Sequence, residues 1–99
     1  MYGTVMIGQL GSPPDQARRV LTDWLAERAP LIPGFVDAGL LVTHDGSTVV
    51  NWARFVDRAA YLALAEDPEQ DRWYRERLEP LLTGQPRWID GDWTDLAIP

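Results

Sequence analysis

The sequence feature that most constrains the fold is a pair of alternating segments joined at Asp45-Gly46. Residues 35–43 and 48–55 alternate in side-chain character from one position to the next, which is typical of β-strands. Asp-Gly between two such segments indicates a type I′ hairpin turn, because these residues tolerate positive φ angles. In residues 48–55, one face carries Val49, Asn51, Ala53 and Phe55, and the other carries Val50 and Trp52. In residues 35–43, one face carries Val36, Ala38, Leu40 and Val42, and the other carries Phe35, Asp37, Gly39 and Leu41.

A strand and a helix are expected before this hairpin. Residues 2–10 alternate as a strand, with Val5 and Ile7 on one face and Thr4 and Met6 on the other. Ser12 followed by two prolines predicts a helix start with Ser12 as the N-cap and proline in the first turn. One apolar stripe then recurs at helical spacing and comprises Ala17, Val20, Leu21, Trp24 and Leu25.

A helix and a strand are also expected after the hairpin. Asp57 is placed to cap a second helix, which Pro68 stops or kinks before a further helical stretch through Leu81. Residues 83–86 predict a turn, and residues 87–96 predict a final strand.

The resulting order, β-α-β-β-α-β, predicts a ferredoxin-like α+β domain with an antiparallel sheet, and one domain over residues 1–99. Two helices cover only one face of such a sheet, so Leu41, Val50 and Trp52 would face water in a monomer. Burying each of them is worth about 1.5–3 kcal/mol. We therefore expect a homodimer formed through the sheet face, with a third layer from a different protein as the alternative.

Composition excludes several classes of function. The net charge of −6 argues against nucleic-acid binding, which requires clustered positive charge. All nine basic residues are Arg, and there is no Cys, so lysine Schiff bases, thiolate chemistry and cysteine metal sites are excluded. No apolar run reaches membrane-spanning length, and the first ten residues lack the basic stretch of a signal peptide. We expect a soluble, cytoplasmic protein with no membrane contact.

Three short motifs resemble the antibiotic biosynthesis monooxygenase family. They are Pro33-Gly34-Phe35-Val36, Asp45-Gly46, and the strand from Val49 to Phe55 with its Val-Asn-Trp centre. The resemblance spans nearly the whole chain in element order and implies a dimeric α+β barrel. It also implies a cofactor-independent monooxygenase that oxidises an aromatic polyketide-like substrate, an anthrone or quinol, with O₂. Such chemistry needs an aromatic pocket and hydrogen-bond donors for an oxyanion, and it needs no metal, flavin or haem.

The resemblance also implies which residues form the site. Asn51, Tyr61 and Arg75 match the family's Asn, Tyr and Arg and are the candidate catalytic residues. Phe55 stands where the family has a Trp, so the ring is kept and the indole N–H donor is lost. Phe55, Trp24, Trp73 and Tyr74 are the candidate substrate-binding residues.

Each of these residues also has a purely structural interpretation. Asn51 is either an oxyanion donor or an amide bonded to nearby backbone. Tyr61 and Tyr74 either offer hydroxyls to a cavity or pack as amphipathic core residues, and the tryptophans either line that cavity or fill the core. Arg75 either stabilises a phenolate or pairs with Asp71 or Glu79 at helical spacing. His44, the only His, is expected to be exposed beside the hairpin turn, with a role as general base as the alternative.

Two other functions remain open on sequence alone. One is a non-catalytic dimeric protein that binds a ligand or assists an enzyme, which the Phe55 departure favours. The other is a cyclase or isomerase that moves protons without O₂.

Overall fold

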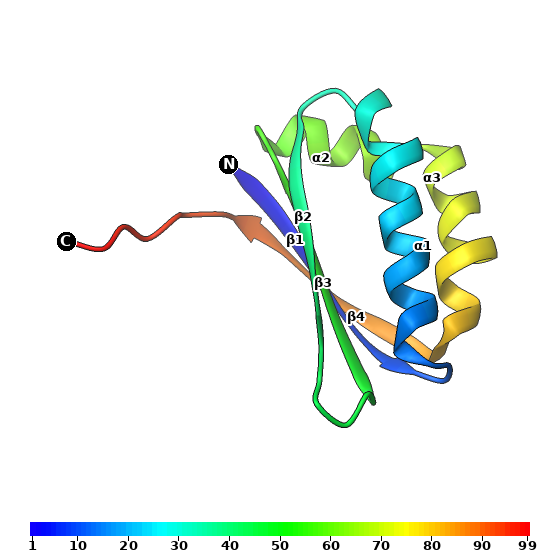
Figure 1. Cartoon of the computed structure of the whole chain (residues 1–99). Helices are drawn as coiled ribbons and strands as arrows, with labels where there is room; N and C mark the ends of the chain where they lie inside the picture. The colour runs from blue at the N-terminus through cyan, green and yellow to red at the C-terminus, as the bar shows by residue number, and fades with distance from the viewer.

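A computed structural model describes all 99 residues. The sheet is formed by β1 (Tyr2–Leu10), β2 (Phe35–Val42), β3 (Thr48–Phe55) and β4 (Leu82–Asp92). These four strands pair antiparallel in the order β2-β3-β1-β4. Three helices, α1 (Pro14–Glu27), α2 (Arg58–Ala65) and α3 (Pro68–Trp73), cover one face of the sheet (Figure 1). The predicted ferredoxin-like α+β fold is thus confirmed.

The hairpin between β2 and β3 is present, but its predicted turn type is wrong. Only Gly46 has a positive φ, at 75°, so Asp45 does not adopt the conformation that a type I′ turn requires. The carboxylate of Asp45 instead accepts hydrogen bonds from the Ser47 backbone N–H at 3.0 Å and the Thr43 hydroxyl at 2.8 Å. The Ser47 hydroxyl also donates to this carboxylate at 2.7 Å, and the three bonds, led by the one from the Ser47 hydroxyl, lower the pKa of Asp45. A longer loop stabilised by a side chain therefore replaces the two-residue turn.

The predicted helix N-termini are only partly correct. Ser12 is not the N-cap of α1, because Pro13 occupies that position and the Ser12 hydroxyl donates to the Leu81 carbonyl at 3.1 Å. Asp57 caps α2 as predicted, accepting from the Ala60 N–H at 2.9 Å. The predicted break near Pro68 is confirmed, because α2 ends at Ala65 and Asp67 is extended; Pro68 itself starts α3, where its missing N–H costs nothing.

The final strand begins earlier than predicted. Residues 83–86, expected as a turn, lie inside β4, which ends at Asp92 and not at Leu96. The pairing of β4 with β1 shifts between Ile7 and Gln9, and Gly84 has a φ of 73°. Residues 83–86 therefore form an irregular part of β4 and not a turn, because β1 continues to pair with β4 as far as Leu10.

A second register shift changes one face assignment on β2. The sequence pattern places Phe35 with Asp37, but the pairing with β3 shifts between these residues and sets Phe35 opposite Phe55. Phe35 consequently packs on the helix side of the sheet, where its ring meets Phe55 edge-on at 5.8 Å. The chain then follows the predicted alternation, with Leu40 opposite Asn51.

Beyond α3 the chain makes a π-helical turn, Tyr74–Leu78, and a 3-10 turn, Glu79–Leu81; another 3-10 turn, Ala29–Leu31, follows α1. Leu78 of the π-helical turn forms a core cluster with Met6 and Val49 between helices and sheet. None of the helices combines the length and hydropathy needed to cross a membrane.

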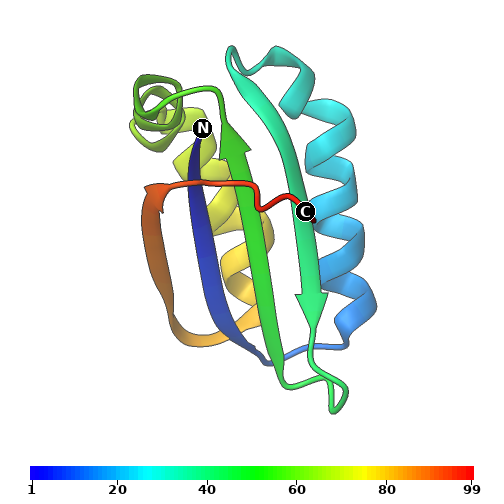
Figure 2. The same cartoon turned by 90° about the vertical axis from the view of Figure 1, so that its left-hand side faces the viewer.

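The opposite side of the sheet carries no helix, and its apolar side chains are here called the open face: Val5, Ile7, Leu41, Val50, Trp52 and Ile89. Leu41 and Ile89 are 56% and 45% exposed. Figure 2 shows the C-terminal segment running across this side of the sheet. Only 10 of the 99 residues are buried.

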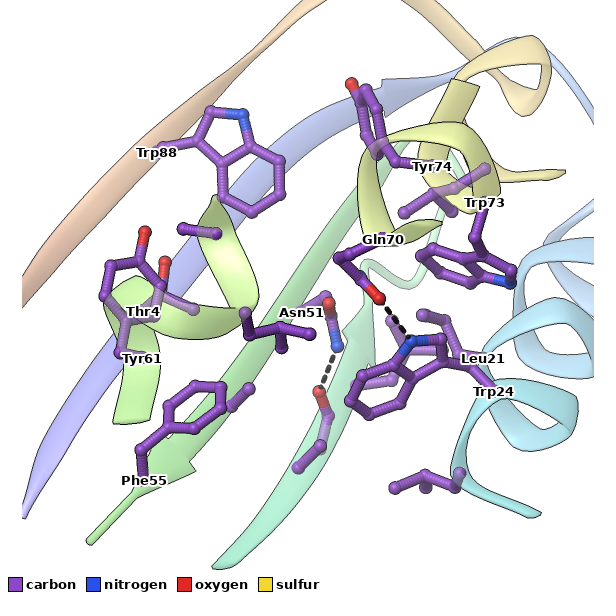
Figure 3. A pocket seen from close by; sticks show the side chains of 18 of the residues that line it. Thr4, Leu21, Trp24, Asn51, Phe55, Tyr61, Gln70, Trp73, Tyr74 and Trp88 are labelled. Atoms are coloured by element: carbon purple, nitrogen blue, oxygen red, sulfur yellow. Dashed lines mark hydrogen bonds between the residues drawn. The ribbon is translucent and has the colours of Figure 1, made fainter. Parts of the chain in front are cut away.

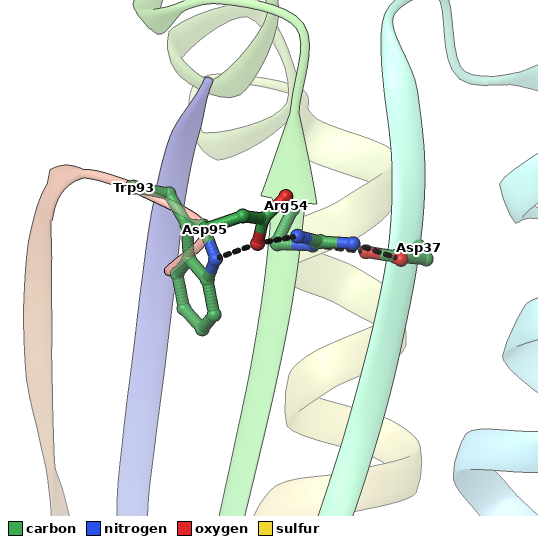
Figure 4. Close-up of polar contacts among 4 residues, drawn as sticks. All are labelled: Asp37, Arg54, Trp93 and Asp95. Carbon is green, nitrogen blue, oxygen red and sulfur yellow. Dashed lines mark hydrogen bonds and ion pairs between the residues drawn. The ribbon is translucent and has the colours of Figure 1, made fainter. Parts of the chain in front are cut away.

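The C-terminal segment is attached to the open face by one polar cluster (Figure 4). Arg54 of β3 donates to both carboxylate oxygens of Asp37, with Nε at 2.6 Å, and to Asp95 at 2.7 Å. The indole N–H of Trp93 also donates to Asp95, and the Trp93 ring packs against Trp52 at 5.6 Å. Asp37 has its pKa lowered by the hydrogen bond from Arg54.

Candidate functional site

A cavity of about 590 Å³ lies between the sheet and the helices. Its lining comes from all four strands and all three helices, and 14 of its 21 lining residues are hydrophobic. Sites for small organic ligands occupy roughly 300–1,000 Å³, so the volume is that of a ligand site and not of a packing defect.

Small side chains on the sheet explain why this space stays empty. Ala38 and Ala53 are paired neighbours on β2 and β3, and both line the cavity together with Gly39. Ala65 is the small residue at the end of α2 that faces it. Larger side chains at Ala38, Ala53 or Ala65 would fill the volume, so these three small residues keep it open.

Aromatic side chains surround the cavity in a chain of contacts. The Trp24 ring lies 6.0 Å from Trp73 and 5.3 Å from Phe35, and the Phe55 ring lies 5.6 Å from Tyr61. Tyr74 and Trp88 form a further pair at 5.9 Å. Figure 3 shows Phe55 and Tyr61 at one end and Trp24 and Trp73 at the other. The arrangement suits a flat, electron-rich ligand, since aromatic rings pack well face to edge.

Asn51 presents unpaired amide groups in this apolar surrounding. Its Nδ2 donates to the Gly39 carbonyl at 3.0 Å, which fixes the amide orientation because a carbonyl oxygen can only accept. No other protein group bonds the Oδ1 atom or the second N–H of Asn51, which lines the cavity. The structural role predicted for Asn51 is thus observed, and its second N–H and Oδ1 have no protein partner.

Gln70 of α3 is a second cavity amide, which sequence reasoning missed. The indole N–H of Trp24 donates to Gln70 Oε1 at 3.0 Å (Figure 3). An indole can only donate, so the Oε1 atom must face Trp24 and the Nε2 atom must face elsewhere. No protein group accepts from that Nε2, and Gln70 lines the cavity. Its position three residues before Trp73 and four before Tyr74 places all three on one helical face, which was the available sequence indication.

Tyr61 is hydrogen-bonded at the end of the cavity nearest Phe55. Its hydroxyl donates to Asp90 Oδ2 at 2.9 Å, and Thr4 donates to the other oxygen of Asp90 at 2.6 Å. Burial, reinforced by Asp90, raises the pKa of Tyr61 to about 12. Burial, with Glu79 adding to it, also raises the pKa of Tyr74. Both tyrosines are therefore neutral phenols near pH 7.

The structure brings six of the seven predicted site residues to the cavity: Trp24, Asn51, Phe55, Tyr61, Trp73 and Tyr74. Arg75 is not among the lining residues. Its Nε donates to Asp71 at 2.9 Å on an exposed surface, and this bond raises the pKa of Arg75. This is the helical ion pair given above as the structural interpretation. His44 lies in the loop between β2 and β3 and does not line the cavity.

No protein-family model and no curated protein sequence matches this chain. Solved structures do match. A monooxygenase from the gene ActVA-Orf6 of Streptomyces coelicolor, solved with the ligand nanaomycin D, has 22% identity and a TM-score of 0.76, covering 99% of this chain and 91% of that chain. SnoaB, a cofactor-independent oxygenase from Streptomyces nogalater, has 22% identity and a TM-score of 0.74, covering 94% of each chain.

A dimeric ferredoxin-like protein of unknown function from Jannaschia sp. CCS1 matches with 16% identity and a TM-score of 0.67, covering 94% of this chain and all of that chain. At such identities the likeness establishes the fold. That fold is the one which the resemblance to antibiotic biosynthesis monooxygenases implied.

Proposed function

We propose that this protein is a cofactor-independent monooxygenase that oxidises a fused-ring phenol or anthrone with O₂. The observation that carries the proposal is an aromatic cavity of about 590 Å³ in which two amides, Asn51 and Gln70, keep unpaired groups. The reactions of two proteins with the same fold, both described as oxygenases, support it.

The proposed reaction needs little from the protein beyond binding and charge stabilisation. An anthrone loses a proton to give an enolate, which passes one electron to O₂; the resulting carbon radical and superoxide join as a peroxide anion on the ring carbon. Proton uptake and loss of water then leave a quinone, so that one oxygen atom of O₂ enters the product and the other becomes water. Hydrogen-bond donors aimed at the oxyanion stabilise the enolate as it forms.

We assign the oxyanion to the second N–H of Asn51 and the Nε2 of Gln70. Gln70 supplies the donor that Phe55 lacks compared with the Trp of the resembling family. Phe55, Trp24, Trp73 and Tyr74 provide the apolar walls against which the rings stack. Arg75 takes no part in this arrangement, because its guanidinium is exposed and bonded to Asp71.

The proposal is tested by O₂ uptake with 1,8-dihydroxy-9-anthrone in the presence of a chelator and without flavin. The wild-type protein should consume O₂ well above the uncatalysed rate, and Asn51→Ala should lose about 10²–10³-fold while remaining folded. Full activity in Asn51→Ala would remove the amide from the site. Tight binding of the anthrone without O₂ uptake would favour a ligand-binding protein, and a product formed without O₂ would favour a cyclase.

We further propose that the working form is a homodimer joined through the open face. Leu41 and Ile89 are exposed there, and Leu96 and Ile98 of the C-terminal segment are 91% and 95% exposed. A partner copy would cover these side chains, as the dimeric description of one protein of this fold supports.

A further inference from the structure

The proposed reaction begins with loss of a proton, and the carboxylate that lines the cavity, Asp71, is held in an exposed ion pair with Arg75 at 2.9 Å. Tyr61 is an ionisable side chain at the Phe55 end of the cavity, and its raised pKa keeps it protonated. His44 and Arg75 do not line the cavity. A carboxylate without a cationic partner, Asp90, is reached instead through side chains that do line the cavity.

Three side chains from three elements form a hydrogen-bonded group at this end. Thr4 of β1 and Tyr61 of α2 both line the cavity, and both donate to Asp90 of β4, at 2.6 Å and 2.9 Å. The pairing of β1 with β4 sets Thr4 directly opposite Asp90, so the strand register fixes their contact. Asp90 itself is exposed to solvent.

The direction of these bonds determines what Tyr61 can do. A tyrosine hydroxyl has one proton, and Tyr61 gives it to Asp90. Toward the cavity the Tyr61 oxygen can therefore only accept. An acidic proton of a substrate in the cavity would therefore meet the Tyr61 oxygen, whose own proton is hydrogen-bonded to Asp90.

We propose that Asp90 is the terminal proton acceptor of the reaction and that Tyr61 carries the proton to it. This inference rests on the proposed function of the cavity. The substrate's acidic C–H or O–H bond breaks as an O–H bond forms at Tyr61, while the original Tyr61 O–H bond breaks and a new one forms at Asp90. The electron pair stays on the substrate as the enolate, and Asp90 releases the proton to water. Thr4 holds the carboxylate in position through its other oxygen.

Few other ionisable groups surround this relay. The Tyr2 ring of β1 packs on Tyr61 at 5.3 Å, and Asp92 lies two residues beyond Asp90 on the same strand. Asp92 pairs with Tyr2 and has no hydrogen bond to Tyr61. Asp92→Asn therefore removes the same charge from the same strand without touching the relay.

The test separates proton transfer from oxygenation. In D₂O without O₂, the wild-type protein should accelerate exchange of the acidic methylene protons of 1,8-dihydroxy-9-anthrone, followed by proton NMR. Asp90→Asn, which keeps the shape and an acceptor for Tyr61, should lose the acceleration by about 10²-fold or more. Tyr61→Phe should lose as much, and the double variant should be no worse than either single one, because both remove one relay. Asp92→Asn should exchange like the wild type.

Aerobic kinetics then complete the assignment. Asp90→Asn should lower kcat and leave KM and anaerobic anthrone binding within about twofold. Normal exchange in Asp90→Asn, or an equal loss in Asp92→Asn, would overturn the relay even if O₂ uptake is normal. Wild-type exchange without O₂ uptake would instead overturn the oxygenase and leave the relay standing. Absence of accelerated exchange in the wild type would overturn the relay itself.

Discussion

Single residues determine both the hydrogen-bonding groups and the free volume of the cavity. Asn51 and Gln70 are oriented by partners that can only accept or only donate, so neither amide can flip without losing a bond. Gly39 provides the carbonyl that holds Asn51 and also lies under the Trp52 ring on the open face. Gly39 therefore takes part in a contact on each face of the sheet.

Gln70→Glu tests the second amide without disturbing its neighbour. The variant keeps an oxygen to accept from the Trp24 indole, but it loses both N–H donors and adds a negative charge. We expect anthrone turnover to fall by about 10²-fold or more, because an oxyanion would face a carboxylate. Gln16→Glu, on the exposed surface of α1, makes the same chemical change and should retain wild-type O₂ uptake. Equal activity in both variants would exclude Gln70 from the site.

Gly39→Ala tests the close packing on the open face. A Cβ at Gly39 would lie 2.3 Å from ring atoms of Trp52, so the indole must move. We expect a loss of about 1–3 kcal/mol in the free energy of unfolding, measured by urea denaturation. Gly91→Ala is the matched control on β4, where a Cβ meets nothing within 4 Å, and it should change stability by less than about 0.5 kcal/mol. A neutral Gly39→Ala would show that Trp52 is not held over this residue.

The contrast between Asn51 and Gln70 shows what the sequence could reveal at this scale. Asn51 is predicted because it matches the Asn of the family that the chain resembles. Gln70 was missed because it lies in an acidic, polar stretch that matches a solvated helix. The Asp90 contact could not be foreseen either, since it depends on the register of β4 against β1, which a shift in pairing alters.

At the scale of elements, local sequence signals predicted the helices more accurately than the last strand. Asp57 and the apolar stripe of α1 predicted their helices correctly, because capping and helical spacing are local properties. The Thr83-Gly84 segment has the composition of a turn, yet it continues β4 because β1 offers pairing partners there. Phe35 changed face for the same reason, since β3 imposes a register shift that β2 alone does not encode.

Asp57→Ala tests the placement of α2, which carries Tyr61 into the cavity. Loss of the bond from the Ala60 N–H should cost about 1 kcal/mol in the free energy of unfolding, measured by thermal or urea denaturation. Asp57→Asn keeps a capping oxygen and should remain within a few tenths of a kcal/mol of the wild type. If the two variants were equally destabilised, charge and not capping would be the cause.

At the scale of the whole molecule, one chain leaves its sheet half covered. The helices occupy one face, and on the other the C-terminal segment adds only Trp93 and the Arg54 cluster (Figures 2 and 4). The apolar alternation on both faces of β2 and β3 indicated this imbalance from sequence. What covers the open face is not a local property, so no sequence pattern within one chain specifies it.

Leu41→Asp tests the homodimer. The mass of the wild-type protein measured by light scattering should be twice the chain mass of 11.2 kDa. The mass of the variant should be that of a single chain, because burying an unpaired carboxylate at the interface is strongly unfavourable. Leu31→Asp makes the same change at a residue 80% exposed in the turn after α1 and should remain dimeric. A wild-type monomer at micromolar concentration would contradict the dimer.

The central claim is that this cavity directs O₂ onto a bound aromatic ring without a cofactor. The most direct measurement is turnover of 1,8-dihydroxy-9-anthrone under ¹⁸O₂ with chelator present and mass spectrometry of the quinone. The account predicts one ¹⁸O atom in each product molecule, formed far faster than in the absence of protein and lost in Asn51→Ala. A quinone oxygen derived from water, or product formed no faster than without the protein, would contradict it.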